Sequence, residues 1–168
     1  MITFHEPSPY RYNFQTIFSA LISNVTNSYL WHDNECRKTH PININITTTG
    51  GFQLIIPCLC SLQTIQYELL TSVLTRYKTG DSVQTIFRVV KLSPQKNVIV
   101  PTVLHEYEVQ WIWPTYVSTT ITVNSAYYVP GDIITVQNSH KEYTDFTVRV
   151  TLSFQYPRPI QDSIRVIQ

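Results

Sequence analysis

Hydrophobic and polar residues alternate along much of the chain after residue 40, with the period of strands that bury one face. Isoleucines alternate with polar residues over 42–47, and the same period occurs in 118–128 and 146–156. Successive side chains of a strand point to opposite faces, so each segment is predicted to be a half-buried strand. The short apolar segment 52–56, which ends at Pro57, is also predicted to be a strand.

Turn residues divide the rest of this region into further strands. Segments 62–78 and 83–92 are separated by Gly80 and Asp81, and we interpret them as the two arms of a hairpin. The pattern of 62–78 also allows a helix, and the strand is preferred because strand signals follow it. The remaining strands are predicted over 98–103, 106–113 and 133–137.

The first 40 residues are less regular. Two prolines predict an extended arm over residues 1–12. Residues 13–25 are the best helix candidate, since their apolar residues from Phe14 to Leu21 recur at helical spacing. Threonine, serine and asparagine within this segment argue against the helix, so the sequence leaves helix or strand open there. Residues 27–40 are predicted to be a polar loop.

The fold class follows from about eight short strands separated by turn residues. This rhythm predicts an all-β fold, an antiparallel sandwich or barrel. The 168 residues include only two alanines, Ala20 and Ala126, which argues against a helical bundle. A chain of this length suits one domain with a substantial core.

The balance and distribution of charged residues exclude some classes of partner. Lys plus Arg is 12 and Asp plus Glu is 11, and the longest basic run is Arg37-Lys38. Binding to phosphates needs clustered cations, so nucleic acid is not expected as a partner. Charged residues make up only 14% of the chain, which suggests a surface covered by partners. No signal peptide is recognised, and no apolar run approaches the roughly 18 residues that span a membrane.

Candidate chemistry is sparse. Cys58 and Cys60 are predicted to be small buried hydrophobic residues, although their role is not fixed by the sequence. On a strand, Glu106 and Glu108 share one face and His105 points to the other, so the three cannot converge. The sequence has no nucleophile elbow, metal-ligand motif or phosphate loop. We therefore expect no enzymatic activity, no metal and no cofactor.

An aromatic group is the best candidate for recognition. Trp111, Trp113, Tyr116, Tyr127 and Tyr128 lie within 18 residues of one another. Trp111 and Trp113 are two residues apart and would share one face of a strand. The group is expected either to fill the core or a subunit interface, or to form an exposed platform for a sugar or a receptor.

Two segments resemble the end of a small jelly roll of the tumour-necrosis-factor/C1q type. They are Ser118 to Gln137, STTITVNSAYYVPGDIITVQ, and Phe146 to Phe154, FTVRVTLSF. The first is an alternating strand that leads through a Gly-Asp corner into a second strand, and the second is a long core strand. The resemblance covers about residues 52–156. It implies a jelly-roll sandwich over 13–156, a trimer or larger assembly, and occurrence in viral capsids and spike or fibre heads.

The tail, residues 157–168, ends in alternating apolar residues, Ile164, Val166 and Ile167, which suit strand exchange with a neighbouring subunit. We therefore expect a non-enzymatic structural protein of a virus particle, either a capsid jelly roll or a trimeric head attached to a capsid. Its partners would be copies of itself and other particle proteins. The alternative is a free trimeric module that binds a carbohydrate or a receptor.

Overall fold

The computed structural model describes residues 12–23, 28–32, 52–70, 78–96, 98–114, 117–139 and 145–156. These residues form strands and connecting turns, and none of them is helical, so the all-β prediction is confirmed. The ten strands are β1 (Tyr12–Ser23), β2 (Ser28–Tyr29), β3 (Leu54–Ile55), β4 (Cys60–Leu70), β5 (Ser82–Gln95), β6 (Val98–Ile112), β7 (Ser118–Thr122), β8 (Tyr127–Tyr128), β9 (Ile133–Ser139) and β10 (Asp145–Tyr156).

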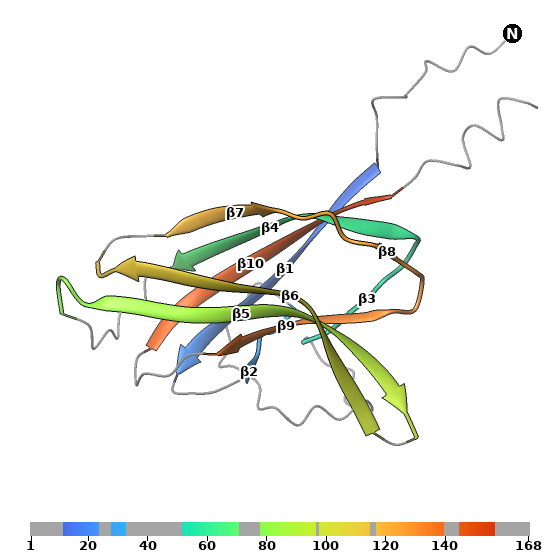
Figure 1. Ribbon diagram of the computed structural model, residues 1–168, viewed down its shortest axis with the longest axis horizontal. Helices are drawn as coiled ribbons and strands as arrows, with labels where there is room; N and C mark the ends of the chain where they lie inside the picture. Colours follow the sequence, from blue (N-terminus) through green and yellow to red (C-terminus); the bar gives the residue numbers. More distant parts are fainter. Residues whose placement is uncertain are drawn as a thin grey trace, which may run out of the picture.

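The strands form two antiparallel sheets that face each other (Figure 1). The first sheet has the order β1-β10-β4-β7, and β8 also pairs with β4. The second has the order β2-β9-β5-β6, and β3 also pairs with β9. The chain crosses repeatedly from one sheet to the other, so strands that are neighbours in sequence are mostly not neighbours in a sheet. This connectivity is that of a jelly-roll sandwich.

The sequence left helix or strand open over 13–25, and the described part of this segment, up to Ser23, is a strand and not the candidate helix. β1 pairs with β10 over its whole length, from Tyr12 opposite Tyr156 to Ser23 opposite Asp145. Phe18 and Ala20 are buried on its inner face. The helical spacing arises because Ile17 and Leu21, on the outer face, are also apolar and half-buried. Pairing with a distant core strand, which local spacing does not report, decides the structure.

The predicted hairpin between 62–78 and 83–92 is also wrong. β4 is a strand as predicted, but it lies in the first sheet between β10 and β7, while β5 lies in the second. β5 instead forms its hairpin with β6. The chain therefore crosses between sheets after β4, a connection that turn residues alone do not reveal.

Strand boundaries differ at three further places. The predicted strands 98–103 and 106–113 are one strand, β6, in which Leu104 is an extra residue between the partners of Val89 and Val90. The single strand predicted over 118–128 is divided into β7 and β8. The predicted loop 27–40 contains β2. The strand predicted over 42–47 lies outside the described residues.

The core lies between the two sheets and consists mainly of aliphatic and aromatic side chains. Tyr67 of β4 stacks on Phe87 of β5 with ring centroids 4.8 Å apart, which joins the sheets at their centres. Phe154 of β10 is fully buried and contacts Phe14 of β1 at 4.9 Å. Burial of such side chains is the main favourable term in folding.

Two Gly-Asp corners have the same internal bonding. In one, Asp81 N–H donates to the Lys78 carbonyl at 3.0 Å, and the Asp81 carboxylate accepts from Lys78 N–H at 2.7 Å. In the other, Asp132 and Val129 make the corresponding bonds at 3.1 and 3.0 Å. The glycine before each Asp has a positive φ, 97° at Gly80 and 93° at Gly131, which glycine adopts without strain.

Candidate interaction surface

The predicted aromatic group is divided between the two ends of the sandwich. Trp111 and Trp113 lie at the end where β6 finishes, beside the Gly80-Asp81 corner (Figure 1). Trp111 is only 5% exposed and belongs to the core, and the half-buried Trp113 packs against it. Backbone bonds of 2.9 Å join Trp113 to Gly80 and Asp81. These two tryptophans therefore offer little surface to a ligand.

Tyr127 and Tyr128 form β8 at the opposite end, where they pair with Ser61 and Cys60. Tyr128 is buried and meets Phe154 edge to face at 6.0 Å. Tyr127 is 62% exposed, more than any other large hydrophobic side chain that the structure describes. The two tyrosines thus have opposite environments, as expected of neighbours on a strand. The other predicted residues, Tyr116, Ile164, Val166 and Ile167, lie outside the described residues.

Four of the exposed hydrophobic side chains of the described residues lie at the β8 end, on both sheets. We call Ile55, Leu59, Tyr127 and Val129 the end surface; they are 55%, 43%, 62% and 50% exposed. They lie on two segments, 55–61 and 127–133, whose backbones are bonded to each other. Ile56 N–H donates to the Asp132 carbonyl at 2.8 Å, and Gly131 N–H donates to the Ile56 carbonyl at 2.9 Å.

Exposed hydrophobic side chains also occur on β6 of the second sheet. A cross-strand row runs from Ile55 through Ile133 and the buried Leu92 to Pro101 of β6. Val100, which precedes Pro101, is 37% exposed, and Val103, two residues after Pro101, is 50% exposed. Ile112, another exposed hydrophobic residue of the described part of the chain, lies at the other end of β6. Exposed apolar side chains concentrated in one part of a protein are typical of an interaction surface.

Polar groups hold this surface in shape. Lys91 Nζ lies 3.3 Å from Asp132 Oδ1, which ties β5 to the Gly131-Asp132 corner. Beneath the surface, burial raises the pKa of the Cys60 thiol to about 12, with a further contribution from Cys58. Cys60 is buried and Cys58 is half-buried, and both are free thiols. Cys60 is therefore protonated at neutral pH and packs as an apolar side chain.

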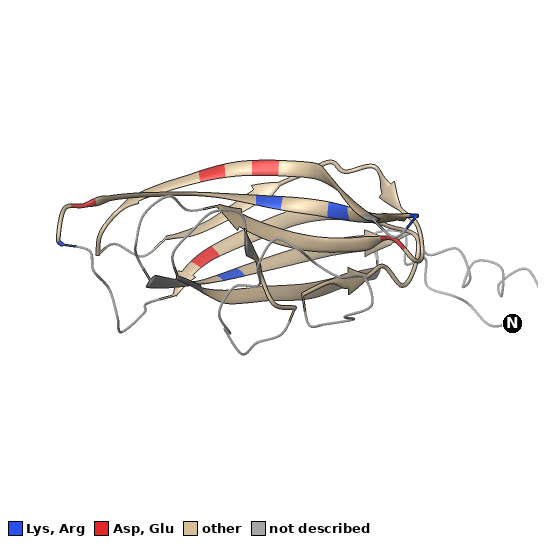
Figure 2. Cartoon of the chain, turned by 90° about the horizontal axis from the view of Figure 1, so that it is seen from below, with Lys and Arg blue, Asp and Glu red and all other residues tan. Residues whose placement is uncertain are grey.

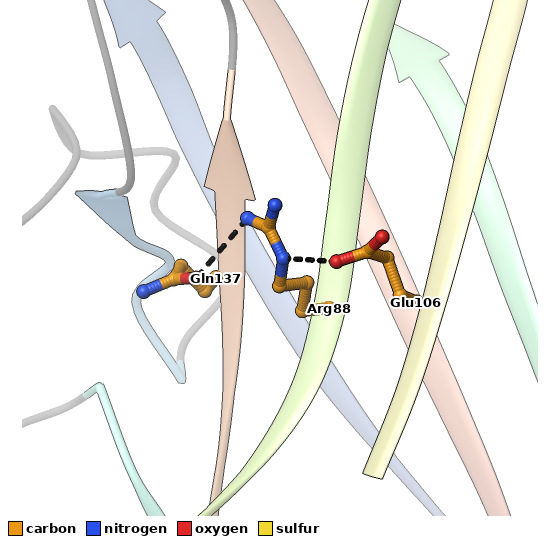
Figure 3. Close-up of polar contacts among 3 residues, drawn as sticks. All are labelled: Arg88, Glu106 and Gln137. Atoms are coloured by element: carbon orange, nitrogen blue, oxygen red, sulfur yellow. Dashed lines mark hydrogen bonds and ion pairs between the residues drawn. The ribbon is translucent and has the colours of Figure 1, made fainter. Parts of the chain in front are cut away.

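Charged residues are few on the described strands, and four of them, Arg88, Lys91, Glu106 and Glu108, lie on β5 and β6 of the second sheet (Figure 2). Arg88 Nε lies 2.5 Å from Glu106 Oε2, and its Nη1 donates to Gln137 Oε1 at 3.2 Å (Figure 3). Glu108 lies on the same exposed face, while His105 is half-buried and burial lowers its pKa. The predicted separation of His105 from the two glutamates is therefore observed.

The described residues contain no group of three His, Cys, Asp or Glu side chains placed to hold a metal ion. Among these residues there is also no helix with the length and hydropathy needed to cross a bilayer. Comparison with protein-family models gives no match, and comparison with curated proteins gives none either. The resemblance to the tumour-necrosis-factor/C1q type therefore stays a prediction.

Sequence reasoning missed three members of the end surface: Ile55, Leu59 and Val129. A signal was present, because Pro57 and Pro130 interrupt strand pairing close to all three. Apolar residues next to prolines and a Gly-Asp corner are expected at a loop tip, where burial within the same chain is difficult. Attention to aromatic residues alone selected Tyr127 and overlooked its aliphatic neighbours.

Proposed function

We propose that this protein is a non-enzymatic structural subunit of a virus particle, either a capsid jelly roll or a capsid-attached trimeric head, and that it acts through contacts between its own copies. The observation that carries the proposal is the end surface, where Ile55, Leu59, Tyr127 and Val129 are exposed on hydrogen-bonded backbone. Burying such side chains against another copy is favourable by roughly 25 cal/mol for each Å² of apolar area.

The composition of the end surface suits a protein interface better than a catalytic site. Tyr127 offers a large side chain with few rotatable bonds, the kind of residue that supplies much of the energy at interface centres. Among the described residues, the charged pair beside this surface, Lys91 with Asp132, already lies within the chain. An incoming apolar surface would therefore leave no charge of this pair unmatched.

The placement in a virus particle is supported by the jelly-roll connectivity together with the resemblance of segments 118–137 and 146–154 to viral and signalling jelly rolls. Its test is electron microscopy of the purified chain. Closed shells are the result expected of a capsid subunit, and discrete trimers that of a capsid-attached head. A chain that stays monomeric at every concentration tested would contradict both.

The role of the end surface is tested by a matched pair of variants. Ile55 and Ile112 are exposed to nearly the same extent, 55% and 58%, but lie at opposite ends. We expect Ile55→Ser to weaken self-association about tenfold in sedimentation equilibrium, and Ile112→Ser to leave it unchanged. Equal effects of the two changes would show that hydrophobicity in general, and not this surface, drives association.

A second function, binding of a carbohydrate or a receptor by a free trimer, is favoured by one feature, the exposed ring of Tyr127. Aromatic rings with an open face can stack on the apolar face of a sugar. Glycan-array binding by the wild-type chain that is lost in Tyr127→Ala, with trimerisation unchanged, is the result expected of this alternative. Loss of association in the same variant is instead the result expected of the structural role.

A further inference from the structure

On one side, the second sheet ends in a single long strand, β6, whose outer edge is open among the described residues. β6 spans Val98–Ile112, and among the described residues it pairs only with β5. The other sheet edges are shorter or interrupted. β7 has five residues, and β1 meets Trp31 at Ser19 through two backbone bonds of 2.8 and 3.0 Å. An open edge of this length presents unpaired N–H and C=O groups in the right spacing for another strand.

The direction of each backbone group on β6 follows from the contacts where the strand ends. Trp113 N–H donates to the Asp81 carbonyl, and the Trp113 carbonyl accepts from Gly80 N–H. Backbone groups alternate in direction along an antiparallel strand. Trp111, Val109 and Tyr107 therefore also face β5. The N–H groups of the alternate residues, Gln110, Glu108 and Glu106, point to the open side.

The open side carries negative charge. Glu106 and Glu108 are exposed on the outer face of β6. Glu106 is paired with Arg88, but Glu108 lies opposite Ile86, and no described cation lies within ion-pair distance of it. A strand added here is therefore favoured if it places a cation beside Glu108 on the same face.

We infer that this edge of one copy receives residues 160–168 of a second copy as an added strand. The inference rests on the proposed self-association and names the segment that completes it. The stretch IQDSIRVIQ contains no proline and alternates Ile164 and Val166 with Arg165. With Arg165 on the outer face near Glu108, Ile164 and Val166 fall on the inner face. Tyr107 and Val109 of β6 lie on that side.

The origin of the tail favours a second copy as the acceptor. β10 ends at Tyr156, and its Gln155 pairs with Ser61, which in turn pairs with Tyr127. Residue 157 therefore follows directly from the end of the sandwich that carries the end surface. A copy docked on that surface lies next to the point where the tail begins. Backbone hydrogen bonds would supply affinity, and Arg165 with its apolar neighbours would fix the register.

The first test is amide hydrogen exchange of the full chain, resolved by residue with NMR or fragmentation mass spectrometry. In the assembled protein we expect slow exchange at Glu106, Glu108 and Gln110, at least tenfold slower than in the dilute monomer. Tyr107 and Val109 face β5 and serve as internal controls, protected in both states. The alternation makes the readout specific, because only the amides on the open side are expected to change their exchange rates on assembly.

The second test exchanges the charges. Glu108→Arg and Arg165→Glu are each expected to weaken association about threefold to tenfold, and the double variant is expected to restore it. Arg158→Glu is the matched control, since it makes the same change in the tail outside the proposed strand. We expect it to associate like the wild type and to keep Glu108 slow to exchange.

The outcomes separate the inference from the proposed function. A wild-type chain that never associates contradicts both. Association with fast exchange at Glu106, Glu108 and Gln110 overturns the inference alone. Slow exchange at these amides in a monomer also overturns it, because the edge is then covered within one chain. Stronger association of Glu108→Arg with no effect of Arg165→Glu overturns it as well, since the glutamates then act only to repel other strands.

Discussion

The two ends of the sandwich contain the same turn and expose different surfaces. At each end a positive-φ glycine precedes an aspartate that bonds the backbone three residues earlier. At the Gly80-Asp81 end, the neighbouring Trp113 folds onto the core. At the Gly131-Asp132 end, the neighbouring Tyr127 and Val129 remain exposed. Equivalent backbone geometry therefore does not decide which end exposes apolar side chains; the side chains beside the turn decide it.

The largest contrast in stability is expected between Trp111 and Tyr127. Trp111→Ala removes a core side chain and should lower the free energy of unfolding by about 3–5 kcal/mol. Tyr127→Ala removes an exposed one and should change it by less than about 0.5 kcal/mol. Urea denaturation of both variants, at a concentration where the chain is monomeric, provides the measurement. A large loss from Tyr127→Ala would mean that the end surface is part of the core.

The reactivity of Cys58 and Cys60 measures how tightly the protein is packed beneath the end surface. Cys36→Ser leaves Cys58 and Cys60 as the thiols of the chain. At pH 8 we expect iodoacetamide to modify Cys60 more than about a hundredfold more slowly than Cys58, because the pKa of Cys60 is about 12 and the thiolate is the reactive form. Mass spectrometry of the modified peptides over time gives both rates. Similar rates would indicate that this end opens in solution.

The two glycines test whether the corners are equivalent in energy as well as in geometry. No atom would contact an added Cβ at Gly80 or Gly131, so the effect of a substitution isolates the positive φ. Gly80→Ala and Gly131→Ala should each lower stability by about 1–2 kcal/mol, and by similar amounts. Thermal or urea denaturation measures both. A markedly larger loss of stability at one corner would show that the turn there also supports the packing of neighbouring residues.

The smallest difference is expected from the aspartates. Asn at either position can still accept the backbone hydrogen bond, so Asp81→Asn should be nearly neutral. Asp132→Asn also removes the ion pair with Lys91 and should cost up to about 1 kcal/mol more at low salt. The difference should diminish in 1 M salt, where exposed charges are screened. A difference that is independent of salt would argue against a role for Lys91.

The sequence predicted the sandwich well because alternation is a local property. The pattern of 146–156 placed β10 correctly, since its core residues Val148, Val150 and Leu152 recur at every second position. Pairing is not local, and there the prediction was less successful. β1 carries apolar residues on both faces, so the spacing of its apolar residues from Phe14 to Leu21 matches that of an amphipathic helix. Nothing between β4 and β5 signals that the chain changes sheets, which led to the wrong hairpin.

The candidate site was predicted only in part, for a related reason. The spacing of Trp111 and Trp113 correctly placed both on one face, but it did not say that this face is the core. Tyr127 and Tyr128 are close to the tryptophans in sequence and lie at the other end of the molecule. The exposure of a side chain depends on which other segments pack against it, and the alternation of hydrophobic and polar residues does not show this.

The pairing of β1 with β10 brings the first and last described residues together, because Tyr12 lies opposite Tyr156. Partners across an antiparallel ladder have Cα atoms about 4.5–5.5 Å apart, so the path from 12 to 156 is almost a closed ring. The chain could therefore be circularly permuted. A short linker would join these two positions, and new ends could open in the exposed turn at Lys78 to Asp81. Every strand would then keep its neighbours while the order of synthesis changed.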